Sequence, residues 1–159
     1  MVSVCSVRKN FSGPCEMSVD IQLLNSDNSD LLDRIGPEVF DNPIDQNQLQ
    51  AFLKDERHFM VIAVDDGAVV GMASAVEYFH PDKPPQFWIN EVGVASTHRK
   101  RGIGRSLVEK LKGIAKKRGC VYAWLGTDNE NIAAQRCFGS VPNGEAPQKF
   151  LLYEWDLEE

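Results

Sequence analysis

The most informative part of this chain is a basic, glycine-containing loop that joins an apolar strand directly to an amphipathic helix. In this chain, the apolar run from Trp88 to Val94 precedes such a loop. The helix that follows is predicted from apolar residues at three- and four-residue spacing, namely Ile103, Leu107, Val108, Leu111, Ile114 and Ala115. This junction directs several backbone N–H groups at one point, at the positive end of the helix dipole. The loop is therefore predicted to bind a phosphate or pyrophosphate group.

Two properties of the loop support an anion site. Glycines permit close approach of the backbone, and basic side chains supply positive charge. The residues predicted to contact the anion are Arg99, Lys100, Arg101, Gly102, Ile103, Gly104 and Arg105. A P-loop is excluded because its glycine spacing and its Lys-Ser/Thr pair are absent. A dinucleotide-binding fingerprint is excluded because Leu107 stands where its third glycine is required.

The motif Arg99-x-x-Gly102-x-Gly104, placed after a strand, resembles the phosphate loop of the GNAT superfamily, the acetyl-CoA-dependent N-acetyltransferases. The order of the predicted elements, β-α-α-β-β-β-α-β-α-β, is similar to that family over residues 18–157. The resemblance implies an α/β (α+β) fold with a mixed, mostly antiparallel sheet of about six to seven strands. About four helices flank the sheet, which splays where acetyl-CoA inserts. The basic loop would then hold the coenzyme A pyrophosphate.

The chain also shows where the other elements are expected. Hairpin and cap signals include Asp65-Asp66-Gly67 and Asp45, and three prolines predict an irregular loop. The predicted strands are 17–24, 59–64, 68–76, 88–94, 121–126 and 149–156; the predicted helices lie around 31–35, after Asp45, at 103–115 and at 131–137; the irregular loop is 80–85.

Composition indicates one globular domain. With 159 residues and a formal net charge of −6, the chain is not expected to bind nucleic acid in general. No apolar run reaches the ~18–20 residues needed to span a membrane. The four cysteines and three histidines lack metal-ligand spacing, so reduced thiols, no bound metal and a cytoplasmic location are predicted.

The N-terminal segment is predicted to lie outside the domain. Residues 1–16 have no sustained periodicity, whereas Met17 opens an alternating stretch. We therefore expect a disordered extension at 1–16 and an acetyltransferase domain at 17–159, with fold and activity independent of the extension.

Glu91 is the leading candidate for the chemistry. Burying a carboxylate within an apolar strand is energetically unfavourable unless the group is hydrated, paired or functional. The alternative interpretation is an exposed or salt-bridged glutamate without a catalytic role. Strand alternation places Glu91 and Gly93 on one face and Val92 and Val94 on the other. The GNAT resemblance implies that Glu91 acts as the base, directly or through water, or holds the substrate ammonium. It also implies that the backbone of Val92, Gly93 and Val94 binds pantetheine, with Gly93 either at a bulge or as a packing residue.

One motif departs from the family pattern. Many GNAT enzymes carry Asn-x-x-Ala-x-x-x-Tyr, and the matching run here begins at Asn131 and ends at Phe138. The resemblance implies that Asn131 contacts pantetheine, although a helix N-cap role is equally compatible. Phe138 takes the cofactor-side position of the tyrosine but has no proton to donate. Water, Cys137 or Tyr122 could protonate the thiolate instead.

Acidic residues in loops suggest a cationic acceptor. The predicted substrate-binding residues are Asp41, Asp45, His80, Asp82, Glu91 and Glu145. The stretches 40–45, 80–84 and 89–94 resemble the aminoglycoside 3-N-acetyltransferase branch, which implies acetylation of the 3-amino group of a gentamicin-type antibiotic. Another small amine, a protein amine and a non-catalytic acetyl-CoA-binding module remain open as well. The resemblance also leaves a homodimer open.

Overall fold

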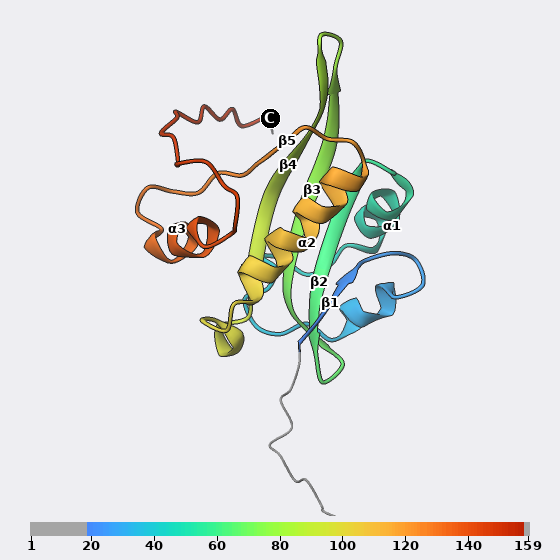
Figure 1. Cartoon of the computed structure of the whole chain (residues 1–159). Helices are drawn as coiled ribbons and strands as arrows, with labels where there is room; N and C mark the ends of the chain where they lie inside the picture. The colour runs from blue at the N-terminus through green and yellow to red at the C-terminus, as the bar shows by residue number, and fades with distance from the viewer. Residues whose placement is uncertain (1–18, 158–159) are drawn as a thin grey trace, which may run out of the picture.

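A sheet with the strand order β1-β2-β3-β4-β5 lies at the centre of the computed structural model, which describes residues 19–157 (Figure 1). The strands are β1 Asp20–Leu23, β2 His58–Asp65, β3 Ala68–His80, β4 Lys83–Val94 and β5 Tyr122–Trp124. Strands β1 to β4 pair antiparallel, and β5 pairs parallel to β4. The predicted mixed, mostly antiparallel sheet is thus confirmed. The expected extension at 1–16 lies outside the described residues.

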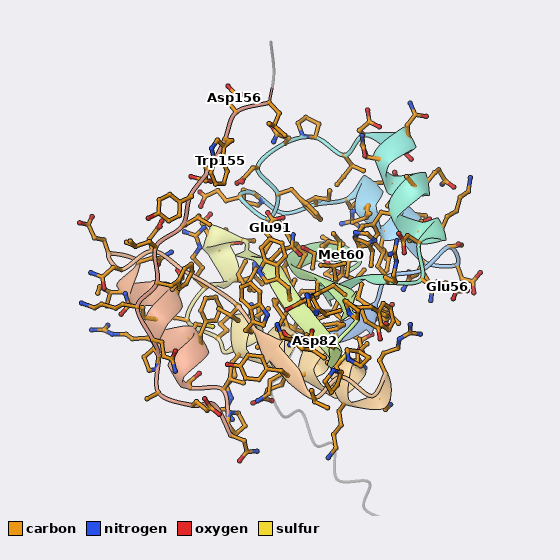
Figure 2. The ribbon with its side chains drawn as sticks, turned by 90° about the horizontal axis from the view of Figure 1, so that it is seen from above. Glu56, Met60, Asp82, Glu91, Trp155 and Asp156 are labelled. Atoms are coloured by element: carbon orange, nitrogen blue, oxygen red, sulfur yellow. The ribbon has the colours of Figure 1, made fainter. Side chains whose placement is uncertain are left out.

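Helices cover both faces of the sheet. They are α1 Gln46–Lys54, α2 Ile103–Lys117 and α3 Ile132–Gly139, with 3-10 turns η1 Ser29–Asp33 and η2 Ser96–His98. Figures 1 and 2 show α2 on one face and α1 on the other. The apolar stripe predicted for α2 is buried at Ile103, Leu107, Val108, Leu111 and Ala115. Its contact with the sheet supplies much of the core.

Gly71 marks the face of the sheet that α2 covers. A β-carbon at this position would lie 3.1 Å from Cγ2 of Ile103 and 3.3 Å from Cδ1 of Leu107. Side chains alternate along a strand, so Ala73 and Ala75 lie on the same face as Gly71. Both alanines are fully or almost fully buried.

The prediction of an irregular loop at 80–85 is wrong. Strand β3 continues to His80 and β4 begins at Lys83, so the two strands form a long hairpin (Figure 1). Pro84 and Pro85 lie where the β3–β4 register shifts, beyond Tyr78. A proline without an N–H donor is tolerated there because the ladder is already interrupted.

The number of elements also differs from expectation. Residues 19–157 contain five strands and three α-helices, rather than about six to seven strands and four helices. The first expected helix is the short turn η1, because Gly36-Pro37 follows and a proline disfavours helical conformation in the residue before it.

The strand predicted at 149–156 does not form. Strand β5 has only three residues, and so short an edge offers few backbone groups to align another strand. Large apolar side chains of the C-terminal segment remain exposed, namely Phe150, Leu151, Leu152, Tyr153, Trp155 and Leu157.

No helix within residues 19–157 is long and apolar enough to cross a membrane. In the same part of the chain, no group of three or more His, Cys, Asp or Glu side chains could hold a metal ion.

Candidate active site

A β-bulge at Asn90 decides which face of the sheet Glu91 occupies. Glu91 pairs with Ser74 of β3, whereas the next pair joins Ile89 to Ala75, so Asn90 is an extra residue in β4. In an unbroken strand, Glu91 would follow Ile89 onto the face beneath α2. The extra residue turns the Glu91 carboxylate to the opposite face, away from the core.

The predicted division of the strand into two faces is confirmed beyond the bulge. A β-carbon at Gly104 of α2 would lie 3.8 Å from Cγ2 of Val94 and 4.0 Å from Cγ1 of Val92. Gly93 instead contacts the segment on the far side of the sheet. The two valines therefore pack toward α2, while Glu91 and Gly93 face away from it.

Gly93 brings the segment 36–45 against β4. A β-carbon at position 93 would lie 2.2 Å from the carbonyl oxygen of Val39, so only glycine allows this approach. Of the two roles predicted for Gly93, the structure supports the packing role, because the bulge lies at Asn90. Arg99 also contacts this segment, through an ion pair of 2.7 Å with Glu38.

A cleft of about 650 Å³ opens beside Glu91, between the segment 36–45 and α1. Figure 2 shows Glu91 and Met60 together in the centre of the molecule. The walls combine apolar and aromatic groups with acids and amides: Leu32, Phe40, Asp41, Asn42, Pro43, Ile44, Asp45, Gln48, Leu49, Ala51, Phe52, Asp55, His58, Met60 and Glu91. Such a lining fits a small organic cation.

The electrostatics of the cleft single out Glu91 and Asp41. Partial burial, reinforced by the negative charge of Asp41, raises the pKa of Glu91 above that of an ordinary glutamate. Asp55 is already paired, because hydrogen bonds from Arg57 hold the pKa of its carboxyl group well below the usual range. Asp45 caps α1 by accepting a hydrogen bond of 2.9 Å from a backbone N–H in its first turn. Glu91 and Asp41 are therefore the acids best placed to meet a cation.

The predicted phosphate loop, residues 99–105, offers backbone N–H donors, whereas most of its basic side chains already have acidic partners. Gly102 adopts φ 80° at the start of α2, Lys100 adopts φ 64°, and no side chain among the described residues caps this terminus. The first N–H groups of the helix thus remain available to a ligand. Three of the predicted phosphate-binding side chains already form ion pairs: Arg99 with Glu38, Arg101 with Asp65 and Arg105 with Glu109.

The edge of β4 beside this loop is unpaired. Strands β4 and β5 pair only from Gln86–Trp88 to Tyr122–Trp124, so β4 continues to Val94 with no β5 partner. The sheet is therefore open along Val92 to Val94, as the predicted splay requires. Nothing lies within 4 Å of a β-carbon built at Gly102, which leaves room for an anion at the helix start.

Helix α3 packs beside the start of α2, next to this opening. Asn131 caps α3 by accepting a hydrogen bond of 3.0 Å from the N–H of Ala134, so its N-cap role is established by the geometry. Phe138 packs partly buried against the core. The Sγ atom of Cys137 would lie 2.9 Å from a β-carbon at Gly104, and burial raises the pKa of the thiol. Of the two side chains considered as proton donors, Cys137 lies closest to the opening, whereas Tyr122 is exposed on β5.

Only some of the predicted substrate residues meet at the cleft. Asp41, Asp45 and Glu91 do, but His80 and Asp82 lie at the tip of the β3–β4 hairpin. Eight residue-to-residue steps lead from Lys83 to Glu91 along β4, or about 26 Å at ~3.3 Å per step, so His80 and Asp82 are remote from the cleft. His80 and Asp82 were predicted to bind the substrate, but the structure places neither of them at the cleft. The reason is that the β3–β4 hairpin is longer than the sequence indicated.

Glu145 also lies outside the cleft, in the irregular chain after α3. The cleft residues that the sequence did not indicate include Gln48, Phe52, His58 and Met60. Phe52 shows the helical spacing of a core residue, and Met60 lies within an apolar strand. Neither local pattern distinguishes a cleft wall from a core.

A family model described as the acetyltransferase (GNAT) family matches residues 23–140. An L-2,4-diaminobutyric acid acetyltransferase of Streptomyces coelicolor is 31% identical over 100 residues, which cover 61% of this chain and 59% of that protein. A streptothricin acetyltransferase of Streptomyces lavendulae is 35% identical over 80 residues, covering 50% of this chain and 40% of that protein. The chain thus spans about half the length of the curated relatives it matches.

Solved structures show the same fold. The aminoglycoside acetyltransferase meta-AAC0020, from an uncultured soil metagenomic sample, superposes with a TM-score of 0.76 at 18% identity, covering 88% of this chain and 97% of that one. The aminoglycoside N-acetyltransferase AAC(6')-Iy, solved in complex with CoA, gives a TM-score of 0.69 at 18% identity, covering 89% and 98%. At these identities the likeness concerns the fold alone.

Proposed function

This chain belongs to the acetyltransferase (GNAT) family, whose cofactor is acetyl-CoA, and we propose that it acetylates an amine bound in the cleft beside Glu91. The observation that carries the proposal is the position of Glu91. Its carboxylate lies at the cleft, and Glu91 itself belongs to the β4 segment, residues 89–94, that β5 leaves unpaired. Acceptor and acetyl donor can therefore meet at this point.

Each part of the site has a task in this reaction. When bound, acetyl-CoA supplies an acetyl group activated as a thioester. Glu91 takes a proton from the acceptor ammonium, directly or through water, and its raised pKa makes it a stronger base than an ordinary glutamate. The backbone groups of Val92, Gly93 and Val94 that point away from β3 are available to pantetheine, and the N-terminus of α2 is available to the pyrophosphate.

We propose that the acceptor is a polycationic small molecule, and specifically the 3-amino group of a gentamicin-type aminoglycoside. A cleft of about 650 Å³ has room for such a ligand, and Asp41 lies close enough to Glu91 to influence its pKa. The solved structures of similar fold include aminoglycoside acetyltransferases, which supports this class of substrate.

A diamino acid is the second candidate acceptor. It is favoured by the sequence similarity to L-2,4-diaminobutyric acid acetyltransferases, two of which match at 31% and 29% identity. A protein amine is the third candidate acceptor. A non-catalytic acetyl-CoA-binding module, by contrast, would bind the cofactor and transfer nothing.

An amine panel distinguishes these candidates. Release of the coenzyme A thiol is measured with gentamicin, sisomicin, kanamycin, spermidine, 2,4-diaminobutyrate and lysine-containing peptides. We expect turnover with gentamicin and sisomicin, and acetylation at the 3-amino group by NMR of the product. Turnover confined to 2,4-diaminobutyrate would replace the aminoglycoside proposal. Cofactor binding without turnover on any amine would favour the module.

Removing the charge of Asp41 is expected to weaken acceptor binding. The Asp41→Asn variant should raise KM for the preferred polycation about tenfold, because a charge-assisted contact of ~1.5 kcal/mol or more is lost. The pKa of Glu91 should also fall, since Asp41 contributes to raising it. Steady-state kinetics and the pH dependence of kcat/KM measure both effects.

Asp82→Asn is the matched control for this variant, because it removes the same charge at the remote hairpin tip. Its KM should equal that of the wild-type protein. An unchanged KM in Asp41→Asn, or an equal rise in Asp82→Asn, would contradict the role given to Asp41.

Replacing Phe138 by tyrosine, the residue that many GNAT enzymes have at this position, tests whether the missing hydroxyl group limits the rate. General-acid catalysis contributes ~10²–10⁴-fold in rate, and some of this is already supplied by another donor. We therefore expect Phe138→Tyr to raise kcat by about tenfold, without changing the affinity for acetyl-CoA. A kcat equal to or below that of the wild-type protein would show that protonation of the thiolate does not limit turnover.

A further inference from the structure

Asp65, at the end of β2, contacts both ends of the basic part of the phosphate loop. Its Oδ2 atom lies 3.1 Å from Nε2 of His98 and 3.6 Å from Nη1 of Arg101. The Asp65 side chain is only 8% exposed, whereas the other two are 20% and 39% exposed. One buried carboxylate oxygen therefore joins two residues that flank the turn at 99–100.

The conformation between these two contacts is unusual. Lys100 adopts φ 64° and Gly102 adopts φ 80°, so two nearby residues occupy the left-handed region. For a lysine, this region is unfavourable unless the surrounding structure imposes it. The loop must nevertheless keep this shape, because it places the first N–H groups of α2 at the anion site.

The His98 ring is itself held on both sides. Its Nδ1 atom lies 2.7 Å from the hydroxyl oxygen of Thr97, and its Nε2 atom faces Asp65. A neutral ring with the hydrogen on Nε2 satisfies both contacts, because Nε2–H donates to Asp65 and Nδ1 accepts from Thr97. The imidazole thus connects η2 to the β2–β3 hairpin.

Charge alone would argue against a carboxylate at this place. Coenzyme A is anionic, and a negative charge near its pyrophosphate site lowers affinity by direct repulsion. Asp65 also pairs with Arg101, which reduces the positive charge available to the phosphates. A direct electrostatic role for Asp65 would therefore be unfavourable to binding.

We propose that Asp65 is a positioning residue for cofactor binding, which holds the phosphate loop in its anion-binding conformation through His98 and Arg101. This inference rests on the proposed function, in that the loop must bind the coenzyme A pyrophosphate. In this proposal, Arg101 fixes the loop through its ion pair with Asp65 and does not bind the phosphates. The β2–β3 hairpin becomes part of the cofactor site although it does not line it.

The proposal is tested by whether Asp65→Asn binds coenzyme A more weakly or more tightly than the wild-type protein. Titration calorimetry of coenzyme A into the free protein should show about tenfold weaker binding for Asp65→Asn, or ~1.4 kcal/mol. Repulsion alone predicts the opposite, because the substitution removes a negative charge. Asp66→Asn is the matched control: it removes the same charge from the neighbouring turn residue, and it should leave the affinity unchanged or slightly higher. Equal or tighter binding by Asp65→Asn would overturn the proposal.

Variants of His98 keep the test decisive if Asp65→Asn does not fold. His98→Ala should weaken coenzyme A binding, whereas His98→Gln, whose amide can still donate to Asp65, should recover part of the affinity. When Asp65→Asn does fold, combining it with His98→Ala should cost little more than either substitution alone. At saturating acetyl-CoA, kcat should stay near the wild-type value. Fully additive losses, or no recovery with glutamine, would refute positioning through His98; absence of coenzyme A binding by the wild-type protein would instead refute the proposed function.

Discussion

Glu91→Gln is expected to lower kcat by about 10²–10⁴-fold, the range for loss of a general base. The glutamine keeps the shape of the side chain at the cleft but cannot accept a proton from the acceptor ammonium. The affinity for acetyl-CoA should change little, because the proposed cofactor contacts are made by backbone groups of β4 and of the start of α2, and not by the Glu91 side chain. Steady-state kinetics with saturating acceptor, together with calorimetry of coenzyme A, separates these two effects.

The pH dependence provides a second readout for Glu91. A raised pKa keeps the carboxyl group protonated to a higher pH, so activity should fall as the pH drops through a value above that of an ordinary glutamate. In Glu91→Gln, this fall of activity at low pH should disappear. Glu145→Gln, which removes an acid outside the cleft, is the matched control and should retain both the rate and the pH profile. A near-normal rate in Glu91→Gln at every pH would remove Glu91 from the chemistry.

Gly104→Val is expected to abolish binding of acetyl-CoA, with an affinity loss of about 100-fold or more, or ~2.8 kcal/mol. A β-carbon at this position would lie 2.9 Å from Sγ of Cys137, with Val92 and Val94 close by. The branched side chain would project between α3 and the open stretch of β4 at Val92 and Val94, where pantetheine is proposed to bind. Calorimetry of coenzyme A measures the loss.

Two controls separate loss of the site from loss of the fold. Gly113→Val changes the same helix where nothing lies within 4 Å of a β-carbon, so cofactor affinity should be kept. Gly104→Val in a Cys137→Ala background relieves the contact with the thiol and should restore thermal stability, but not cofactor binding. Unchanged affinity in a folded Gly104→Val variant would contradict the assignment of the phosphate loop.

Local patterns were sufficient to predict α2 and the loop before it. Both depend on residues adjacent in sequence: an apolar stripe at helical spacing, and glycines where the chain turns. The N-cap role of Asp45 followed in the same way. For these elements, the tertiary structure reinforces what the local sequence already favours.

Long-range pairing could not be read in the same way. The face occupied by Glu91 depends on the bulge at Asn90, which exists only in relation to β3. The partners of Arg99 and Arg101 are Glu38 and Asp65, far away in sequence, so these basic residues resembled free phosphate ligands. Spacing within a loop does not reveal a partner on another strand.

The hairpin shows why some acids were misassigned. Three prolines predicted a loop near the site, but β3 and β4 extend through 80–85 and carry Asp82 to the far end of the sheet. Conversely, the cleft beside Glu91 is assembled by the close contact of Gly93 with Val39. A glycine that permits such a contact looks like any other strand glycine in the sequence.

The central claim is that this chain transfers an acetyl group from acetyl-CoA to an amine bound beside Glu91. Mass spectrometry of a reaction with acetyl-CoA and sisomicin tests it most directly, with wild-type protein and Glu91→Gln run in parallel. We predict that the wild-type protein adds one acetyl group to each sisomicin molecule and releases free coenzyme A, and that the variant forms almost no product in the same time. Equal product formation by both proteins would contradict the role of Glu91, and the absence of any acetylated amine across the panel, with coenzyme A bound, would contradict the transfer itself.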